Sequence, residues 1–433
     1  MRIIHTSDWH LGQHFMGKSR EKEHQAFLDW LLSFISQSRA DALVVAGDIF
    51  DTGTPPSYAR AMYNDFIVSL QKTGCHGTVI LGGNHDSPAT LNEAKELLAC
   101  LNTIVIGNIS ALPEDHVIVL NKADGSPGAI FCGIPFIRPR DLVFSMAEES
   151  GQDKKQVLAD AISLYYEQVF QAALGIQDKL GIQDQHGREQ PLPIIATGHL
   201  TVVGGRTSES VRDIYIGSLD AFPAKNFPSA DYIALGHLHQ GQQIKGADHI
   251  RYSGSPIPLS FDEARRSKQV LQVDFEEGAL QKIESVPIPC FRTLTCIKGD
   301  LKQIEKQINA LENRVRDRTL WLEVEVAGDD YFMDLQTRVQ DMIEDKSIEL
   351  LRIRRKRKPY ESGLTTESKE KLEELTPMEV FLRRLAMEEI DDREKDQLLN
   401  LFKEINSQVD QVDQVDQVDQ VDQVDQVDQG NPL

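Results

Sequence analysis

Five short polar motifs share one placement in this chain, because each follows an apolar run of strand length. We interpret the runs at residues 3–6, 42–46, 78–81, 194–197 and 232–235 as β-strands. The motifs that follow them are, in order, Asp8-Trp9-His10, Gly47-Asp48-Ile49-Phe50-Asp51, Gly83-Asn84-His85-Asp86, Gly198-His199 and Gly236-His237-Leu238-His239. Helical patterns separate the strands, including the apolar stripe formed by Phe27, Leu31, Phe34 and Ile35. Strands that alternate with helices predict an α/β or layered fold.

The five motifs supply the side chains of a metal site. Their carboxylates, imidazoles and single amide carbonyl suit manganese, iron or zinc. In open α/β sheets, ligands collect at the carboxyl ends of strands, and glycine lets the backbone come close to an ion. The donors are numerous enough for two ions. The bridging ligand should be a carboxylate, because its negative charge offsets the repulsion between the cations.

Each motif also has an explanation without a metal. An Asp-x-His pair is common, Gly-Asp-x-x-Asp often forms a turn, and a Gly-His pair more often contains a hydrogen-bonded histidine than a ligand. The occurrence of all five in this order, each at a strand end, favours the metal site. His5, His14 and His24 lie near the motifs, and we interpret them as packing or surface residues.

The composition favours a soluble, reduced protein of two or three domains. The 433 residues contain five scattered cysteines without a Cys-x-x-Cys spacing, which argues against a disulfide framework and a zinc–thiolate site. The sequence has neither an apolar run of membrane-spanning length nor the pattern of a signal peptide at its N-terminus. We therefore expect a cytoplasmic protein.

The net charge of −21 is unusual for a protein that binds nucleic acid. Seven of the acids lie in Gln-Val-Asp repeats between Gln408 and Asp428, so the rest of the chain carries −21 + 7 = −14. The repeat lacks large apolar residues and should be disordered. If the chain binds DNA, it must use local basic patches, bound metals or a partner.

The second half of the chain has three further segments. Residues 150–190 are polar and contain Leu-Gly-Ile-Gln-Asp twice, and we interpret them as a helix and loop in a surface insertion. A βαβαβ pattern then covers 292–354, with strands at 292–297, 321–326 and 348–354 and helices near 300–314 and 330–344. In its second strand Leu322, Val324 and Val326 alternate with Glu323 and Glu325, the pattern of a half-buried sheet.

The segment before the repeat predicts a linker and two short helices. Residues 359–375 are polar, and Thr376-Pro377-Met378-Glu379 has the pattern of a capping box that begins a helix to about Glu389. Asp391 or Asp392 could cap a second helix that carries Leu398, Leu399, Phe402 and Ile405. Two amphipathic helices without a core of their own either pack on the body or bind a partner.

The five motifs together resemble those of the calcineurin-like metallophosphoesterase superfamily. Thr-Ser-Asp-Trp-His-Leu-Gly-Gln, Ala-Gly-Asp-Ile-Phe-Asp-Thr-Gly and Gly-Ser-Pro-Ile-Pro-Leu-Ser-Phe-Asp-Glu at 254–263 closely resemble the SbcD-type nucleases, over about residues 1–407. The resemblance implies a four-layer α/β/β/α sandwich with a small capping domain and a C-terminal helix pair. The expected parts are a nuclease domain (1–285), a capping and DNA-binding domain (286–358), a linker with partner-binding helices (359–407) and a disordered tail (408–433).

The resemblance also implies a role for each motif residue. The ligands of one metal ion would be Asp8, His10, Asp48 and His239, and those of the other Asp48, Asn84, His199 and His237. Asp48 would bridge the two ions, which are expected to be Mn²⁺, with Mg²⁺ as the alternative. His85 would contact the scissile phosphate and assist the leaving oxygen, and Asp86 would orient the His85 ring and favour its charged form.

The activity that the resemblance implies is that of the nuclease subunit of an SbcCD-like complex. Such a subunit is an ATP-dependent double-strand exonuclease and single-strand endonuclease that cuts hairpins and DNA ends in replication, recombination and repair. ATP hydrolysis would belong to the SMC-like ATPase SbcC, docked on the terminal helices, because this sequence has no Gly-x-x-x-x-Gly-Lys-[Ser/Thr] loop. The resemblance also implies a homodimer within a heterotetramer, with the dimer contact formed by the helices after Asp51 and Asp86. The complex is expected in the cytoplasm, associated with the nucleoid.

The sequence signal for DNA as the substrate is less specific than the signal for the metal site. The basic run consists of Arg352, Arg354, Arg355, Lys356, Arg357 and Lys358. It is either a solvated strand end or a contact for the phosphate backbone. A small-molecule cyclic phosphodiesterase would leave the capping domain and terminal helices without purpose. A protein phosphatase usually has Arg where Thr52 follows Asp51. The complete ligand set argues against a non-catalytic scaffold.

Overall fold

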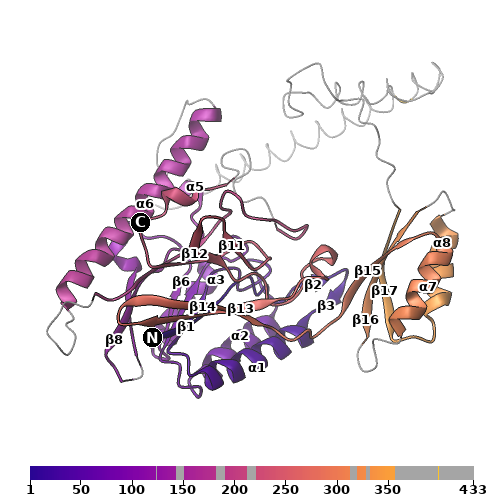
Figure 1. The fold of residues 1–433 in the computed structure, drawn as a ribbon, viewed down its shortest axis with the longest axis horizontal. Helices are drawn as coiled ribbons and strands as arrows, with labels where there is room; N and C mark the ends of the chain where they lie inside the picture. The colour runs from indigo at the N-terminus through magenta and orange to yellow at the C-terminus, as the bar shows by residue number, and fades with distance from the viewer. Residues whose placement is uncertain are drawn as a thin grey trace, which may run out of the picture. The chain divides into compact units, whose positions relative to one another are not determined.

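The computed structural model describes residues 1–122, 124–142, 151–181, 191–211, 221–312, 319–327 and 332–355, together with Leu398. The chain divides into two compact units, Met1–Lys356 and Arg357–Leu433. The fold described below belongs to the first unit (Figure 1). The expected linker, terminal helices and Gln-Val-Asp tail lie outside the described residues, apart from Leu398.

Two six-stranded sheets pack face to face. The first has the order β14-β13-β1-β4-β5-β6, with β14 at Ala279–Pro287, β13 at Gln269–Glu276, β1 at Arg2–Thr6, β4 at Ala42–Val45, β5 at Gly77–Leu81 and β6 at Thr103–Ile106. The second has the order β11-β12-β10-β9-β8-β7, with β11 at Gln242–Ile244, β12 at Ala247–Tyr252, β10 at Tyr232–Gly236, β9 at Ile194–His199, β8 at Pro127–Cys132 and β7 at Val117–Asn121. A buried cluster that includes Ile3, Val44, Ile195 and Tyr232 joins the two sheets.

Helices cover the outer face of each sheet. Helices α1 (Glu21–Ser38) and α2 (Ser57–Leu70) share a buried cluster with the first sheet, and the short α3 (Pro88–Asn92) and α4 (Lys95–Ala99) contact β6. On the second sheet lies α6 (Gly151–Leu180), preceded by α5 (Pro139–Leu142). The layers therefore run helix, sheet, sheet, helix (Figure 1). This confirms the expected four-layer α/β/β/α sandwich.

The interpretation of residues 150–190 as a surface insertion is wrong for the helix. Ile162, Tyr166 and Val169 of α6 are buried against the second sheet, and the Tyr166 hydroxyl donates a hydrogen bond to the carbonyl of Thr197 at 3.0 Å. The high content of polar residues hid an apolar face of helical spacing. Helix α6 is thus one of the four layers.

The pattern at 292–354 folds as predicted into a second, smaller layered body. Parallel strands β15 (Leu294–Gly299), β16 (Leu320–Val326) and β17 (Ile348–Arg355) pair in that order. Helices α7 (Leu301–Glu312) and α8 (Phe332–Ile343) pack on one face through Ile304, Val324 and Val339. The expected solvent face differs, because Glu323 is only 1% exposed.

The other face of this small sheet packs near the metal motifs. Leu294 and Trp321 form a buried cluster with Phe261 and with Phe15, which lies in the hairpin of β2 (His14–Phe15) and β3 (Lys18–Ser19). The guanidinium of buried Arg20 lies 5.4 Å from the ring centre of Phe15 and 5.3 Å from that of Trp321. The sheet of β15, β16 and β17, called the capping sheet below, is therefore held close to the motif that contains His10.

Candidate metal centre

The five motif loops meet at one edge of the two sheets. Strands β1, β4 and β5 are parallel neighbours in the first sheet, and β9 and β10 are parallel neighbours in the second, so their carboxyl ends point the same way within each sheet. Loops from the two sheets then touch directly. The backbone N–H of His237 donates to Asp8 Oδ1 at 2.8 Å, and His199 Nδ1 lies 2.9 Å from the carbonyl of Ala46.

One cluster of donor atoms comes from Asp8, His10 and His239. Their ligand atoms all lie within 4.8 Å of one another, and each residue is at most 2% exposed. Asp8 Oδ2 accepts a hydrogen bond from the Ser7 hydroxyl at 2.5 Å. His10 Nδ1 lies 3.1 Å from Asp51 Oδ1, which leaves Nε2 to face the cluster.

The second cluster comes from Asp48, His199 and His237, with Asn84 beside them. The first three place their ligand atoms within 4.8 Å of one another and are buried. Asn84 Oδ1 lies 2.9 Å from His199 Nε2 and 3.1 Å from His237 Nδ1. All seven residues expected as ligands therefore gather in two adjoining groups.

Asp48 lies between the two groups. Its Oδ2 is 3.5 Å from His10 Nε2 in the first and 3.2 Å from His199 Nε2 in the second. Its Oδ1 accepts the backbone N–H of His85 at 2.9 Å, which fixes the carboxylate in this position. The position is the one that a bridging carboxylate requires.

The polar atoms of the centre fit divalent cations. Nε2 of His10 and Nε2 of His237 are buried and have no hydrogen-bond partner. If His199 Nδ1 donates to Ala46, its Nε2 lone pair faces the oxygens of Asn84 and Asp48. Buried lone pairs that converge without a proton between them are costly, and a cation satisfies them. The donor set fits two divalent metal ions.

The charges of the centre reinforce one another. Burial alone would raise the pKa of the Asp48 carboxyl, but His199 and His10 hold that pKa well below its usual range. Burial alone would lower the pKa of His199, but Asp48 raises it to about 9. The pKa of His237 is well below its usual range because of burial and the charge of His199. Asp48 thus remains ionised in this buried cluster.

The backbone of the centre is held in a conformation that side chains usually avoid. Asp8, His10, Asp48 and His237 all have positive φ, of 54°, 48°, 52° and 93°. Such conformations cost free energy and persist at functional sites where the surroundings fix them. Gly83 shows how tight the packing is, because a Cβ there would overlap both the carboxylate and the backbone nitrogen of Asp48.

The role expected for Asp86 needs correction. Its carboxylate accepts the backbone N–H groups of Ile49, Phe50 and Gly83 at 3.0, 2.9 and 2.9 Å. The His85 ring is instead oriented by its Nδ1, which lies 2.8 Å from the backbone carbonyl of Asp51. Burial, with a contribution from Asp48, raises the pKa of Asp86 to about 6. Asp86 therefore ties the second and third motif loops together and does not orient His85.

The sequence did not reveal the residues that support His239. The Ser210 hydroxyl lies 2.6 Å from His239 Nδ1 and 2.5 Å from Glu263 Oε1, and Lys268 Nζ lies 2.6 Å from Glu263 Oε2. Burial tends to raise the pKa of Glu263, but Lys268 and His239 hold it well below its usual range. Glu263 ends the stretch 254–263 noted for its resemblance, which was the one available signal.

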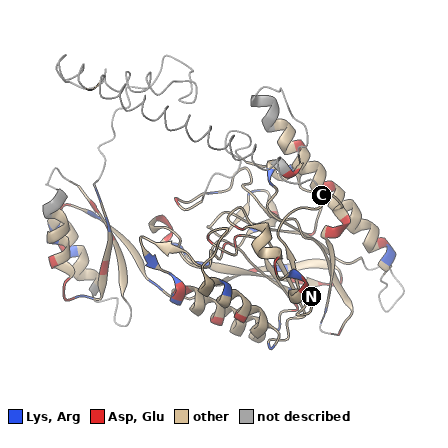
Figure 2. Ribbon diagram, turned by 180° about the vertical axis from the view of Figure 1, so that it is seen from behind, with Lys and Arg blue, Asp and Glu red and all other residues tan. Residues whose placement is uncertain are grey.

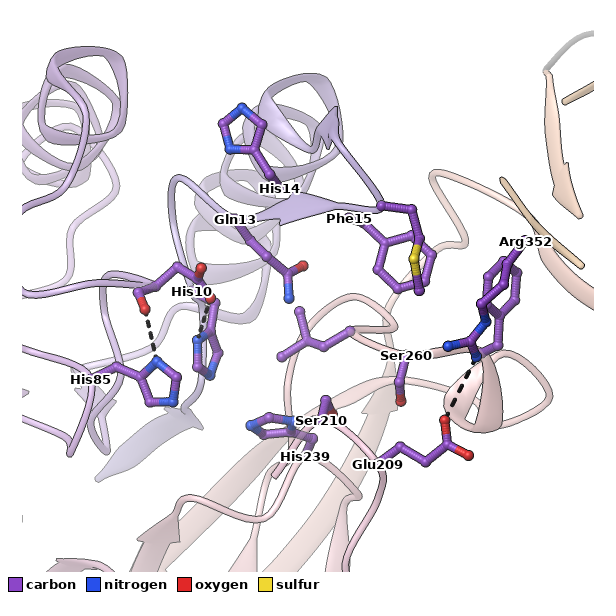
Figure 3. A pocket seen from close by; sticks show the side chains of 14 residues that line it. His10, Gln13, His14, Phe15, His85, Glu209, Ser210, His239, Ser260 and Arg352 are labelled. Atoms are coloured by element: carbon purple, nitrogen blue, oxygen red, sulfur yellow. Dashed lines mark hydrogen bonds and ion pairs between the residues drawn. The ribbon is translucent and has the colours of Figure 1, made fainter. Parts of the chain in front are cut away.

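The near-motif histidines differ in their surroundings. His5 is buried, and its Nδ1 lies 2.9 Å from the Tyr232 hydroxyl, and His24 is buried as well. His14 lines a pocket with His10, His85 and His239. The interpretation as packing or surface residues is confirmed, because His5 and His24 are buried and His14 is exposed, with its ring turned away from His10 and His85 (Figure 3).

The described part of the basic run faces carboxylates of the same chain. Arg352 and Arg354 both pair with the buried Glu323, and both approach Glu209 at 3.8 Å. The side chain of Arg355 and residues Lys356, Arg357 and Lys358 lie outside the described part. Their expected contact with DNA stays a prediction.

Comparison with known families agrees with this geometry. The model of the calcineurin-like phosphoesterases matches residues 1–241, and that of the type 5 capsule protein repressor C-terminal domain matches residues 290–389. The chain belongs to the calcineurin-like phosphoesterases. A dimetal phosphatase from Danio rerio aligns with a TM-score of 0.35 and 15% identity over 66% of this chain and 98% of its own, a likeness too weak to support an argument.

Relatives define the family more narrowly. The SbcD subunit of nuclease SbcCD from Escherichia coli strain K12 is 50% identical over 93% of this chain and 97% of its own. Its counterpart in Bacillus subtilis is 31% identical over 75% of this chain and 79% of its own length. The counterpart in Rhodobacter capsulatus is 35% identical over 67% of this chain and 69% of its own length. Within the phosphoesterases, this chain belongs to the SbcD family of SbcCD nuclease subunits.

Proposed function

We propose that this chain hydrolyses phosphodiester bonds of DNA as the nuclease subunit of an SbcCD-type complex. One observation carries the proposal: seven donor residues from five loops gather in two adjoining groups around Asp48, in a chain of this family. We expect double-strand exonuclease activity that depends on ATP, and single-strand endonuclease activity, which act on hairpins and DNA ends in replication, recombination and repair.

We assign the metal ligands as two sets that share Asp48. The first set is Asp8, His10, Asp48 and His239, and the second is Asp48, Asn84, His199 and His237. Two bound ions, Mn²⁺ or alternatively Mg²⁺, would supply the Lewis-acid activation of phosphate and water that this class of hydrolysis needs. The residues hold the donor atoms in place before the substrate binds, through hydrogen bonds such as that from Ser7 to Asp8.

His85 is the proposed proton donor to the leaving oxygen. It lines the pocket of about 320 Å³ that also contains His10 and His239, at hydrogen-bonding distance from the Asp51 carbonyl. If Nδ1 donates to this carbonyl, Nε2 is the ring nitrogen that meets the substrate. Asp86 acts indirectly, because its hydrogen bonds to the backbone set the loop on which His85 lies.

The substrate and partner are assigned to the second half of the chain. We propose that residues 286–358 cap the metal centre and contact the DNA backbone, and that the helices expected within 359–407 bind an ATPase subunit of the SbcC type. Figure 2 shows Lys and Arg interspersed with Asp and Glu along the described elements. DNA affinity must then come from local groups and metal ions rather than from total charge.

We expect the complex in the cytoplasm, associated with the nucleoid. Among the described residues, no helix is both long and apolar enough to cross a membrane.

We further propose a homodimer through α2 and α4. A groove of about 760 Å³ lies between these helices and α3, lined by Tyr63, Leu91 and Leu97 among others. Leu97 is 69% exposed, and Val68 of α2 is 54% exposed. Exposed apolar side chains beside a groove fit a second copy of the same surface, as twofold symmetry requires.

The test of the proposed activity is manganese-dependent cleavage of labelled single-stranded and duplex DNA by the purified chain, beside its Asp48→Ala variant. A chromogenic phosphodiester measures small-ester hydrolysis in parallel. Cleavage of DNA that disappears in the variant is the expected result. Hydrolysis of the small ester without DNA cleavage, even with the SbcC-type ATPase added, would contradict the proposal and favour a small-molecule phosphodiesterase.

A further inference from the structure

Two arginines of the capping sheet share one buried carboxylate. Glu323 on β16 is paired in register with Arg352 on β17, and Arg354 follows on the same face. The Nε of Arg352 bonds Glu323 Oε1, and the Nε of Arg354 lies 3.1 Å from that oxygen. Two guanidinium groups against one carboxylate leave an excess positive charge, which is available to another anion.

The chain supplies that second anion from the nuclease domain. Glu209 Oε2 lies 3.8 Å from Nη2 of Arg352, and Glu209 Oε1 lies 3.8 Å from Nη1 of Arg354. The side chain of Glu209 is 52% exposed, whereas that of Glu323 is 1% exposed. Long, exposed ion pairs contribute little to stability, so Glu209 is held far more weakly than Glu323.

The backbone beside Glu209 is anchored independently of the arginines. The N–H of Glu209 points to Asp262 Oδ2 at 3.3 Å, and the next residue, Ser210, bonds Glu263 and His239. Release of the Glu209 side chain from Arg352 therefore leaves these anchoring hydrogen bonds in place. The side chain can exchange while the loop remains in position.

The pair formed by Glu209 and Arg352 lies in the same pocket as the metal centre. Both residues line the pocket together with His10, His85 and His239 (Figure 3). A DNA strand with one phosphate at the metal centre would carry further phosphates along this pocket. Glu209 thus lies where a neighbouring backbone phosphate would meet the two guanidinium groups.

We propose that Glu209 is an exchangeable internal substitute for a DNA phosphate. It pairs with Arg352 and Arg354 when no DNA is bound, and a phosphodiester displaces it. The inference rests on the proposed nuclease function. Glu323 keeps the two arginines in place during the exchange. An uncharged ligand could not displace Glu209, so the exchange favours a polyanion over other molecules that fit the pocket.

The test measures DNA binding without cleavage. Binding of a fluorescein-labelled single-stranded oligonucleotide to the full chain is followed by anisotropy in EDTA, at several salt concentrations. Glu209→Gln should bind about 2–5-fold more tightly than the wild type, the gain expected when an exposed competing ion pair is removed. Glu277→Gln is the matched control, because it removes one exposed negative charge from the turn between β13 and β14.

A double-mutant cycle identifies the mechanism. When Arg352 and Arg354 are both changed to Ala, the further change Glu209→Gln should raise the DNA affinity by no more than Glu277→Gln does. Equal gains for Glu209→Gln with and without the arginines, or weaker binding by Glu209→Gln, would overturn the exchange. A wild-type chain that binds no oligonucleotide and cleaves none, even with metal and the SbcC-type ATPase added, overturns both the exchange and the nuclease function. DNA cleavage combined with an unchanged affinity of Glu209→Gln overturns the exchange alone.

Discussion

The metal centre and the arginine pair of the capping sheet are built in opposite ways. In the centre, Asp8 and Asp48 are at most 1% exposed, have positive φ and are fixed by short hydrogen bonds from other loops. The side chains of Arg352 and Arg354 are 28% and 38% exposed and share a single buried partner. Hydrolysis needs donor atoms in one fixed arrangement, whereas contact with a flexible polymer needs long side chains that can adjust.

If the centre is as rigid as this comparison implies, a single methyl group should disrupt it. Gly83→Ala places a Cβ against the carboxylate and backbone nitrogen of Asp48, so the bridging ligand must move. We expect a loss of about 100-fold or more in the rate of manganese-dependent cleavage, since a displacement near 1 Å at a catalytic centre has an effect of that order. The measurement is kcat, with circular dichroism to confirm folding.

Gly53→Ala is the control for that experiment. It lies in the loop after Asp51, and its added Cβ would make only ordinary contact with Ser87, at 3.4 Å. It should retain nearly full activity. Equal losses in both variants would show that the loops tolerate no change at all, and full activity in Gly83→Ala would show that the centre is not rigid.

The support behind His239 should have an intermediate effect. Ser210→Ala removes the hydroxyl between His239 and Glu263, so the imidazole loses its orientation. Outer partners of this kind change metal affinity by about 10–100-fold, and we expect the weaker Mn²⁺ binding at the lower end of that range. Isothermal titration with Mn²⁺ measures it. Ser208→Ala is the matched control, because that hydroxyl bonds Glu263 at 2.7 Å but is not bonded to His239. Affinities that fall equally in the two variants would refute a specific role for Ser210.

The capping sheet should show the smallest effect. Glu323→Gln removes the charge that holds Arg352 and Arg354, which are partly exposed and can turn to solvent. We expect a loss of about 1–2 kcal/mol in the free energy of unfolding, below the cost of breaking a fully buried pair. Urea denaturation measures it. Glu325→Gln breaks only the pair with the exposed Lys298 and should change stability by less than about 0.5 kcal/mol. A loss of unfolding free energy larger than that expected for breaking a fully buried ion pair would show that the arginine pair is as firmly fixed as the metal centre.

The sequence predicted the parts of the molecule that local patterns encode. The five motif strands, the βαβαβ segment and the gathering of Asp8, Asp48 and His237 all follow from apolar runs that end in polar loops. Parallel pairing brings the carboxyl ends of such strands together, so a local sequence pattern predicts contacts between residues that are far apart in the sequence. The metal centre could therefore be predicted in outline.

The parts that sequence reasoning missed depend on contacts between distant segments. Ser210 and the pair Glu263 and Lys268 come from two separate stretches to meet at His239, and no spacing in the sequence predicts that contact. Glu323 alternates like a solvent-facing residue, but it is buried and paired with Arg352 and Arg354. Helix α6 was misjudged because its polar residues outnumber the apolar face that packs on the second sheet.

The central claim is that the seven donor residues bind two divalent ions. The direct measurement is the number of Mn²⁺ ions bound per chain, by titration followed with electron paramagnetic resonance, for the wild type and for Asp48→Ala. We predict two ions per wild-type chain and a marked loss of affinity at both sites in the variant, because Asp48 contacts both groups. One ion per wild-type chain, or two ions bound with unchanged affinity by Asp48→Ala, would contradict the account.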